Sequence, residues 1–417
     1  MAPNQITNTI KKLVVLPSLL LLFTVLIFLS SSSERVVVEE VKEPIVVPKN
    51  PYLEDFIADY ESYLKEKEER GLAPGFAVAI VKDTSVVYLK GFGVKQVYTQ
   101  DSIDTNTVFR IASVSKGFAA ALTGILDEDE MLSLNDKVAK HLDEFALIER
   151  SATDSLSLRH VLSHTTGLPY HAYTNLIEDE VSLDKMLNEL SNVKLIGKAG
   201  EYYSYQNVAY SLIEPVIHEV TGRQYQDLLC EKIFNPLGMI NASSSLEAMK
   251  NNTNVAQPHL YGGVGKWRKT KISEKYYNTA AAGGINASIS DMSQWLLALL
   301  GNQPEVINNS VIDELFTPII RTPIKRKYFG QWRKVKEAEY GLGWRILTYG
   351  DDTLAYHGGY ANGFKAQIAV NKEENIGICV LANAPARFVN KTVPTFFDKY
   401  ESYKDSIKYF DNSIMLF

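Results

Sequence analysis

Cysteine and excess positive charge are both scarce in this chain. Its 417 residues contain two cysteines, Cys230 and Cys379, and carry a formal net charge of −6. Both cysteines lie in apolar runs, DLLCEKIF and IGICVLAN, so buried free thiols are a better prediction than a disulfide or a catalytic thiol. A net negative charge argues against non-specific binding to nucleic acid. We therefore expect neither a disulfide framework nor a nucleic-acid partner.

Metal-ligand and nucleotide motifs are also missing. His160 and His164, in HVLSH, have the i, i+4 spacing of some zinc ligands, but there is no H-E-x-x-H motif and no evident third ligand. The glycines of AAGGIN, from Ala281, lack the strand, the third glycine and the acidic partner of a dinucleotide fingerprint. The sequence therefore predicts no metal and no organic cofactor.

One long apolar run stands at the N-terminus. Residues 13–29, LVVLPSLLLLFTVLIFL, follow Lys11 and Lys12 and are near the lower length limit for spanning a bilayer. No clear cleavage site follows, so residues 1–33 are either a cleaved signal peptide or a retained signal-anchor. The two lysines favour a cytoplasmic N-terminus. We expect the rest of the chain in the periplasm or outside the cell, anchored to the inner membrane by residues 13–29 or secreted after cleavage.

The remainder of the chain divides into three parts. Residues 34–51 mix charges with prolines and are predicted to be a tether. Residues 52–400 form the main domain, and residues 401–417 a helical tail.

Within the main domain, strand patterns lie at both ends. GFAVAIVKDTSVVYLKGFGV, residues 75–94, predicts two strands, and strand patterns return from Tyr340 in YGLGWRIL, TLAYHGGY and FKAQIAVNKEENIGICVLAN. Residues 120–310 are mostly helical in pattern. This arrangement predicts an α+β fold, in which both ends build an antiparallel sheet around a mostly helical insertion.

A serine and a lysine share one helix face in RIASVSKGF. Ser113 and Lys116 are at positions i and i+3, which brings the amine near the hydroxyl. A serine is a poor nucleophile until a base takes its proton. A lysine can be that base when burial lowers its pKa. The same spacing recurs at Ser62, Ser182 and Ser191 in charged helices, so alone it is weak, and a helix cap or surface pair remains the competing interpretation.

Several ordered blocks carry a resemblance. TVFRIASVSKGFAAALTGILDEDEMLSLNDKVAKHL, LRHVLSHTTGLP, YSYQNVAYSLIEPVIHEVTGRQYQDLL, NPLGM, AAGGINASISDMSQWLLALL, YGLGW and YHGGYANGF occur in this order across roughly residues 52–390. The set resembles the beta-lactamase-related serine hydrolases of the class C type, which include D-alanyl-D-alanine carboxypeptidases, D-aminopeptidases and esterases. The resemblance implies the beta-lactamase/transpeptidase-like fold.

The resemblance also assigns roles to residues. Ser113 matches the nucleophile and Lys116 its helical partner. Tyr205 and Asn207, in YQN, match the Y-x-N element. A phenol near an ammonium shuttles protons, and the Asn207 amide either orients Lys116 or binds a substrate carbonyl. From spacing alone, Tyr205 is one more buried tyrosine in a chain with 23 of them.

A strand motif completes the predicted site. His357, Gly358 and Gly359 match the position where lactamases and transpeptidases usually have Lys-Thr-Gly, and the N–H groups of Ser113 and Tyr360 would form the oxyanion hole. Histidine and glycine replace a cation and a hydroxyl, and they bind a substrate carboxylate less well. This departure shifts the expectation from beta-lactamase toward peptidase or esterase.

These observations predict an exported or membrane-tethered serine hydrolase that acts through an acyl-enzyme. The first substrate expectation is a peptide or related amide containing a D-residue, the second is an ester, and the third is a beta-lactam. A low-turnover penicillin-binding or scaffold protein is the alternative from another class. The basic, aromatic segment 321–337 is either a solvated loop or a contact for anionic lipid or cell-wall polymer. The sequence does not define the oligomeric state.

Overall fold

The computed structural model describes residues 49–263, 266–324 and 329–414. The predicted signal or anchor segment, and the tether as far as residue 48, lie outside these ranges. Within them, no helix is both long enough and apolar enough to cross a bilayer. Residues from Asn50 onward form a single compact unit.

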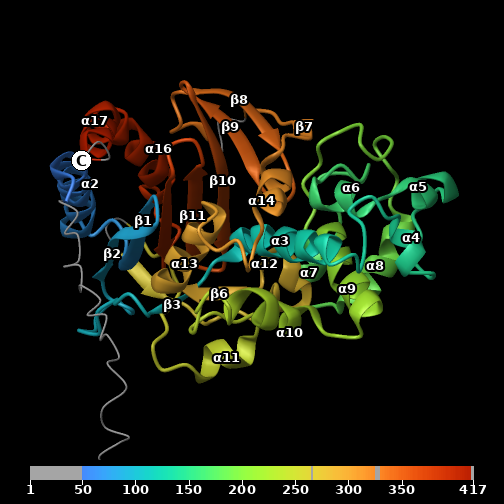
Figure 1. The fold of residues 1–417 in the computed structure, drawn as a ribbon. Helices are drawn as coiled ribbons and strands as arrows, with labels where there is room; N and C mark the ends of the chain where they lie inside the picture. The colour runs from blue at the N-terminus through green and yellow to red at the C-terminus, as the bar shows by residue number, and fades with distance from the viewer. Residues whose placement is uncertain (1–48, 264–265, 325–328, 415–417) are drawn as a thin grey trace, which may run out of the picture. The chain divides into compact units, whose positions relative to one another are not determined.

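An antiparallel sheet of eight strands crosses this unit, in the order β2-β1-β12-β11-β10-β9-β8-β7. The first strand of the chain therefore pairs with its last strand, and β2 pairs with β1 at the edge, so both chain ends build one sheet, as the sequence predicts (Figure 1). The strands are β1 (Gly75–Lys82), β2 (Ser85–Gly93), β7 (Ile320–Arg321), β8 (Val335–Tyr340), β9 (Arg345–Tyr349), β10 (Asp352–Ala361), β11 (Phe364–Asn371) and β12 (Ile376–Ala382).

Both faces of the sheet are buried. Alternate residues of β1 divide between two cores, with Phe76 and Val78 in one and Ala77 and Ala79 in the other. This division follows from the two-residue period of a strand. A strand covered on both faces reads as a continuous apolar run, and all eight residues of β1 are buried.

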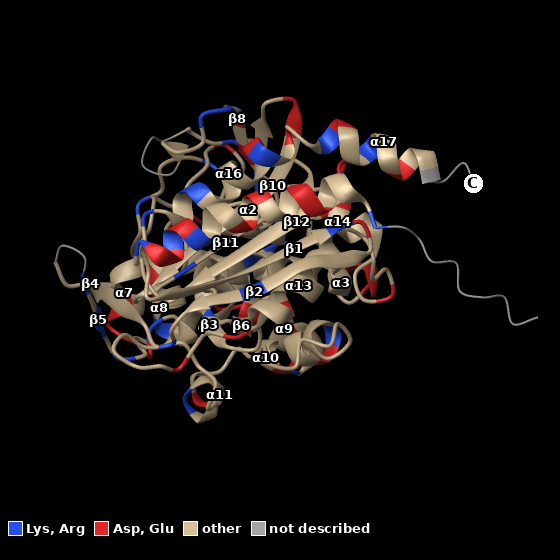
Figure 2. Ribbon diagram, turned by 90° about the vertical axis from the view of Figure 1, so that its left-hand side faces the viewer, with Lys and Arg blue, Asp and Glu red and all other residues tan. Residues whose placement is uncertain are grey.

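One face is covered by helices from both ends of the chain. They are α2 (Pro51–Glu69), α16 (Val389–Tyr400) and α17 (Lys404–Ile414). Asn50 caps α2 by accepting from the N–H groups of Tyr52 and Leu53, and its amide also donates to the Ile407 carbonyl of α17. In Figure 2, α2 and α17 carry charged residues of both signs, whereas the neighbouring strands are nearly free of them. These helices therefore combine a buried apolar side with a polar outer side.

The other face is covered by α3 and the helical insertion that surrounds it (Figure 1). The helices here are α3 (Ser115–Glu128), α4 (Val138–His141), α5 (Arg150–Ser155), α6 (Leu158–Leu162), α7 (Thr174–Glu178), α8 (Leu183–Glu189), α9 (Ile213–Thr221), α10 (Tyr225–Leu229), α11 (Leu246–Asn251), α12 (Ala280–Gly283), α13 (Ile289–Leu299) and α14 (Asn309–Phe316). Short helical turns occur at η1 (Ala112–Val114), η2 (Leu190–Asn192), η3 (Ala209–Leu212), η4 (Cys230–Phe234) and η5 (Tyr277–Thr279).

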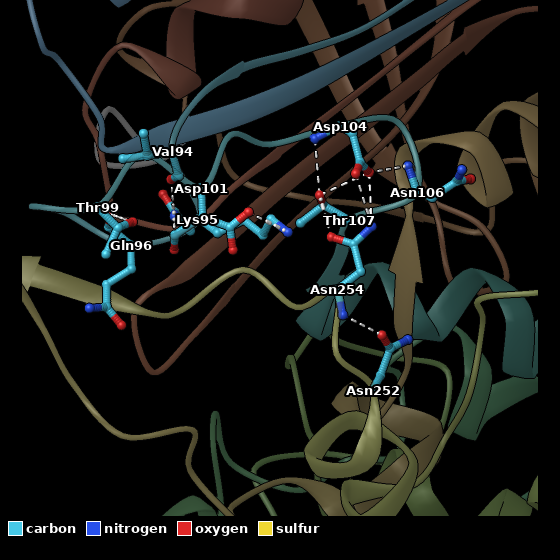
Figure 3. A network of polar contacts seen from close by, with 11 residues as sticks. Val94, Lys95, Gln96, Thr99, Asp101, Asp104, Asn106, Thr107, Asn252 and Asn254 are labelled. Atoms are coloured by element: carbon cyan, nitrogen blue, oxygen red, sulfur yellow. Dashed lines mark hydrogen bonds and ion pairs between the residues drawn. The ribbon is translucent and has the colours of Figure 1, made fainter.

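Two small ladders lie outside the main sheet. One pairs β3 (Val108–Arg110) with β6 (Asn286–Ser288) and joins the insertion to the chain before α3, and the other pairs β4 (His259–Tyr261) with β5 (Trp267–Lys269) within the insertion. Polar contacts fix the start of β3 (Figure 3). Thr107 donates to Asn254 Oδ1 at 2.9 Å, and Asn254 donates to Asp104 at 3.0 Å. This network fixes the strand that leads directly to Ser113.

The α+β prediction is confirmed. The prediction of two strands in residues 75–94 is also confirmed, with the turn at Asp83 and Thr84. YGLGWRIL is not one strand, because β8 ends at Tyr340 and β9 begins at Arg345. Gly343, with φ +75°, turns the chain between them.

Candidate active site

Ser113 lies in a tight turn between β3 and α3. The turn η1 leads straight into α3, and the preceding Ala112 has φ +49°. A non-glycine residue in this region is strained, and such strain is common at functional sites. β3 pairs with β6, and η1 contacts β10, so the turn is held between this ladder and the main sheet.

Lys116 lies one turn along α3 and is fully buried. Its amine donates to Asn207 Oδ1 and to the Ala282 carbonyl, both at 2.8 Å. The amine also lies 4.7 Å from the centre of the Tyr205 ring. Burial, and after it the charge of Arg345, hold the pKa of Lys116 well below its ordinary value of 10.5. Neutral carbonyl partners thus hold this amine, and among the described residues no carboxylate bonds to it.

Tyr205 lies between the serine and the lysine. Burial raises the pKa of Tyr205 strongly, and a hydrogen bond with the Ser113 side chain lowers it in part. The ring packs 4.2 Å from the ring of His164, measured between centroids. Asn207, two residues on, is buried and orients the amine of Lys116. The structure therefore brings Ser113, Lys116, Tyr205 and Asn207 together.

The strand β10 has a free edge beside this group. β9 pairs with β10 only from Asp352 to Tyr356, so residues 357–361 pair on one side alone, with β11. Asn362 and Gly363, with φ +45° and +91°, form the two-residue turn to β11. Counting back from this turn, the cross-strand residue pairs of β10 and β11 are alternately hydrogen-bonded and not hydrogen-bonded. Tyr360 belongs to the second pair, which is not hydrogen-bonded. Its N–H therefore points away from β11, toward the free edge.

Gly359 lets β10 approach the nucleophile turn. A Cβ placed on Gly359 would lie 2.2 Å from the Ile111 carbonyl oxygen. This distance is too short for any side chain, so only glycine fits here. Gly358 faces the opposite side of the strand, where a Cβ would lie 2.8 Å from the Tyr356 hydroxyl. The hydroxyl of Tyr356 thus occupies space next to the position where a residue-358 side chain would stand.

His357 is buried, and both of its ring nitrogens have protein partners. Nε2 lies 3.1 Å from the Tyr340 hydroxyl, and Nδ1 lies 3.0 Å from the Gly358 carbonyl oxygen. Since a carbonyl only accepts, Nδ1 carries the proton and Nε2 accepts from Tyr340. Burial first, then Arg345 and Lys116, hold the pKa of His357 well below its ordinary value. The imidazole is therefore neutral, as the sequence predicts.

A cavity of about 400 Å³ joins these residues. The predicted site residues that line it are Ser113, Tyr205, Asn207, His357, Gly358, Gly359 and Tyr360. Lys116 lies behind this surface, bonded to Asn207. The lining also contains Arg345 and Lys365 and, among the described residues, no aspartate or glutamate. The cavity is therefore cationic.

Comparison with known proteins identifies the family. A model of the beta-lactamase family matches residues 61–394, which is most of the chain. The chain belongs to the beta-lactamase family.

Relatives of this beta-lactamase family member have varied names. The chain is 25% identical over 334 residues to "Unguisins hydrolase ungD'" of Aspergillus campestris, and the alignment covers 78% of this chain and 61% of the relative. It is 26% identical over 340 residues to "Protein flp" of Staphylococcus aureus strain NCTC 8325, covering 80% and 64%. The chain thus spans less than two thirds of the length of these relatives.

A solved structure supports the fold. The octameric penicillin-binding protein homologue from Pyrococcus abyssi matches with a TM-score of 0.71 and 24% identity, covering 82% of this chain and 76% of the other. This match agrees with the beta-lactamase/transpeptidase-like fold predicted for the family member.

Sequence reasoning missed Arg345, which contributes a cation to the cavity of this family member. Its guanidinium carbon lies 5.7 Å from the Tyr340 ring centre and 5.8 Å from the Tyr203 ring centre. Burial lowers the pKa of Arg345, and four neighbouring tyrosines more than offset this and raise it. The available signal was its place directly after YGLGW, where it is the lone charge in WRILTY.

The two histidines considered as metal ligands have other roles. His160 Nδ1 accepts from the Ser157 N–H in the cap of α6, and His164 Nδ1 accepts from the Gln206 N–H. Burial, followed by the charges of Lys116 and His357, lowers the pKa of His164 far below its ordinary value. In the part of the chain that the structure describes, no group of three or more His, Cys, Asp or Glu side chains is placed to hold a metal.

Proposed function

We propose that this protein is a serine hydrolase that forms an acyl-enzyme on Ser113. The observation that carries the proposal is the continuous arrangement of Ser113, Tyr205 and the buried amine of Lys116. Ser113 Oγ attacks a substrate carbonyl carbon, and a bond forms between them. The leaving group departs with a proton, and water then releases the acyl group.

Opposite pKa shifts support a division of labour between Tyr205 and Lys116. The lysine pKa is lowered and the tyrosine pKa is raised. The neutral amine is therefore the proton acceptor, and the phenol relays the proton from Ser113 and later to the leaving group. Asn207 and the Ala282 carbonyl hold the amine in place for this transfer.

Two backbone N–H groups would hold the oxyanion. The N–H of Ser113 lies at the start of the helical segment, and the N–H of Tyr360 points into the free edge of β10. Donors placed where negative charge develops stabilise the tetrahedral intermediate. The close approach of β10 to η1 that Gly359 permits supports this arrangement, in which both donors would bond one carbonyl oxygen.

The free edge also favours an extended peptide as substrate. A strand with one unpaired side can add a substrate segment by main-chain hydrogen bonds. The cationic lining, to which Arg345 and Lys365 contribute, favours a substrate with an anionic group. We propose a D-residue-containing peptide or related amide first, an ester second and a beta-lactam third. A relative named as a hydrolase of unguisins is consistent with hydrolytic activity.

A panel of substrates tests this proposal. The protein and its Ser113→Ala variant are assayed with D-amino-acid peptides, p-nitrophenyl esters and nitrocefin, and are labelled with a fluorophosphonate. We expect labelling and turnover that vanish in the variant, with the highest kcat/KM for a D-residue peptide that carries a carboxylate. Turnover unchanged in Ser113→Ala would refute the mechanism. Absence of labelling and turnover in the native protein would favour the low-turnover binding or scaffold role.

Export through the N-terminal segment remains part of the proposal. It rests on the apolar run 13–29 and the lysines before it. Mass spectrometry of the mature N-terminus after expression of the full chain distinguishes a cleaved, secreted protein from one that keeps residues 13–29 as an anchor. A start near Ser33 means cleavage, whereas an intact N-terminus in the membrane fraction means an anchor. Intact protein recovered only from the cytosol would contradict export.

A further inference from the structure

Glu214 lies close to the machinery around Lys116 without touching the cavity. It is at the start of α9, on the side that faces α12. Its Oε1 accepts from the Ala281 N–H at 2.9 Å, and the carboxylate also accepts from the Ala280 N–H. These are the first two residues of α12, whose N-cap residue, Thr279, makes no side-chain cap bond. Glu214 therefore caps α12 from a neighbouring helix.

The next residue of α12 holds the catalytic amine. The Ala282 carbonyl accepts from Lys116 Nζ at 2.8 Å. Glu214 and Lys116 are thus connected through three consecutive alanines: the first two donate their N–H groups to Glu214, and the carbonyl of the third accepts from Lys116. These alanines are buried and have no polar side chain that could fix the turn. The position of the Ala282 oxygen therefore depends on backbone contacts, among them the two N–H groups that donate to Glu214.

The second partner of Lys116 is attached to the same element. Asn207 precedes η3, and η3 continues into α9, which carries Glu214. The Ser211 N–H donates to the Asn207 carbonyl at 3.2 Å, so a backbone hydrogen bond ties Asn207 to η3, which leads directly into the start of α9. Both oxygens that receive the lysine amine are consequently connected to one carboxylate.

We propose that Glu214 is a positioning residue, which fixes the two oxygens that hold the amine of Lys116. It acts through α12 and through η3 and touches no substrate. The proposal rests on the proposed role of Lys116 as proton acceptor. A displacement of the amine by a fraction of an ångström to one ångström reduces the rate of proton transfer without changing the cavity lining, since misplacement of about 1 Å can cost roughly 10²-fold.

The test compares variants of Glu214 by two readouts. One is the rate constant for fluorophosphonate labelling of Ser113, and the other is the division between kcat and KM for a p-nitrophenyl ester. Glu214→Gln keeps an oxygen acceptor for the α12 N–H groups, whereas Glu214→Ala removes it. Glu219→Gln, an exposed change on the same helix, is the control.

We expect Glu214→Ala to reduce labelling and kcat by at least ~10-fold while KM changes by less than about 3-fold. Glu214→Gln should stay within about 3-fold of the native rate, and Glu219→Gln should be unchanged. Labelling of Glu214→Ala at the native rate would overturn the proposal, as would Glu214→Gln being as slow as Glu214→Ala.

Two further arms keep the test decisive. If Glu214→Ala does not fold, Glu214→Asp, with its carboxylate withdrawn by one methylene, takes its place. The Asp variant should fold and label slowly, and a native rate would overturn the proposal. Failure of the proposed function would look different, because the native protein itself would then show no Ser113-dependent labelling.

Discussion

The two faces of the central sheet differ in what they bury. Against α2 and α16 the core is aromatic, with Phe396 packed 5.2 Å from Phe56 and 5.3 Å from Tyr60, measured between ring centroids. Against α3 the core also contains the charged or polar side chains of Lys116, Asn207, His164 and His357. Buried apolar rings stabilise a fold directly, whereas buried polar groups cost stability unless they are fully bonded. The first face therefore stabilises the molecule, and the second bears the cost of the chemistry.

The largest expected effect comes from the amine on the second face. Lys116→Met keeps the length of the side chain and removes the amine, so proton transfer from Ser113 loses its acceptor. We expect kcat for an ester to fall by roughly 10³–10⁴-fold, while the thermal midpoint stays the same or rises. Lys232→Met, a surface change, is the control. If Lys116→Met lost much stability but kept its activity, the assignment of the chemistry to the second face would be wrong.

The opposite result is expected on the aromatic face. Phe396→Ala removes a fully buried ring that contacts the rings of α2. The free energy of unfolding should fall by about 3–5 kcal/mol, as measured in urea. Below the unfolding transition, kcat should equal that of the native protein. A reduced kcat in folded Phe396→Ala would mean that the two faces are coupled.

A pH dependence of stability separates the polar face further. Burial raises the pKa of Glu214 from 4.5 to about 7, so the folded state holds this proton more tightly than the unfolded state. The stability that the folded state gains from binding this proton more tightly is fully present below pH 4.5 and is lost as pH rises through 7. The free energy of unfolding of Glu214→Gln, relative to that of the native protein, should therefore rise by up to roughly 3 kcal/mol between pH 5 and pH 8.

Thermal unfolding of both proteins at several pH values measures this gain. Glu219→Gln should show no such change, because that side chain is exposed. A midpoint difference between Glu214→Gln and the native protein that is constant from pH 5 to pH 8 would contradict the raised pKa.

The smallest effects concern the free edge of β10, where this strand approaches Ser113. Gly359→Ala would place a Cβ against the fixed Ile111 carbonyl, so β10 must move away from Ser113. We expect kcat/KM to fall by roughly 10–10²-fold. Gly358→Ala meets only the end of the Tyr356 side chain and should lose less. An equal or larger loss in Gly358→Ala would show that the approach of β10 to η1 is not what Gly359 provides.

Much of this arrangement could be predicted from the sequence. The run GFAVAIVK is apolar throughout because both faces of β1 are buried, and the motif blocks place Ser113, Tyr205 and His357 in one cavity. Arg345 and Glu214 could not be predicted, because their roles depend on which backbone and side-chain groups distant segments bring beside them. The carbonyl of Ala282 has no side-chain signal at all. The partner of His357, Tyr340, lies within YGLGW, but this pairing becomes visible only when the fold brings the end of β8 within hydrogen-bond distance of His357 on β10.

The central claim is that Ser113, among the neighbouring hydroxyls, accepts the acyl group. Ser115 is the natural comparison, since it is two residues away and fully buried, and its hydroxyl accepts from the Ile285 N–H at 3.1 Å. The direct measurement is rapid acid quenching of a turning-over ester, followed by peptide mapping by mass spectrometry. We predict a single acyl adduct on Ser113, abolished in Ser113→Ala and retained in Ser115→Ala. An adduct on another residue, or turnover with no adduct in either protein, would contradict the account.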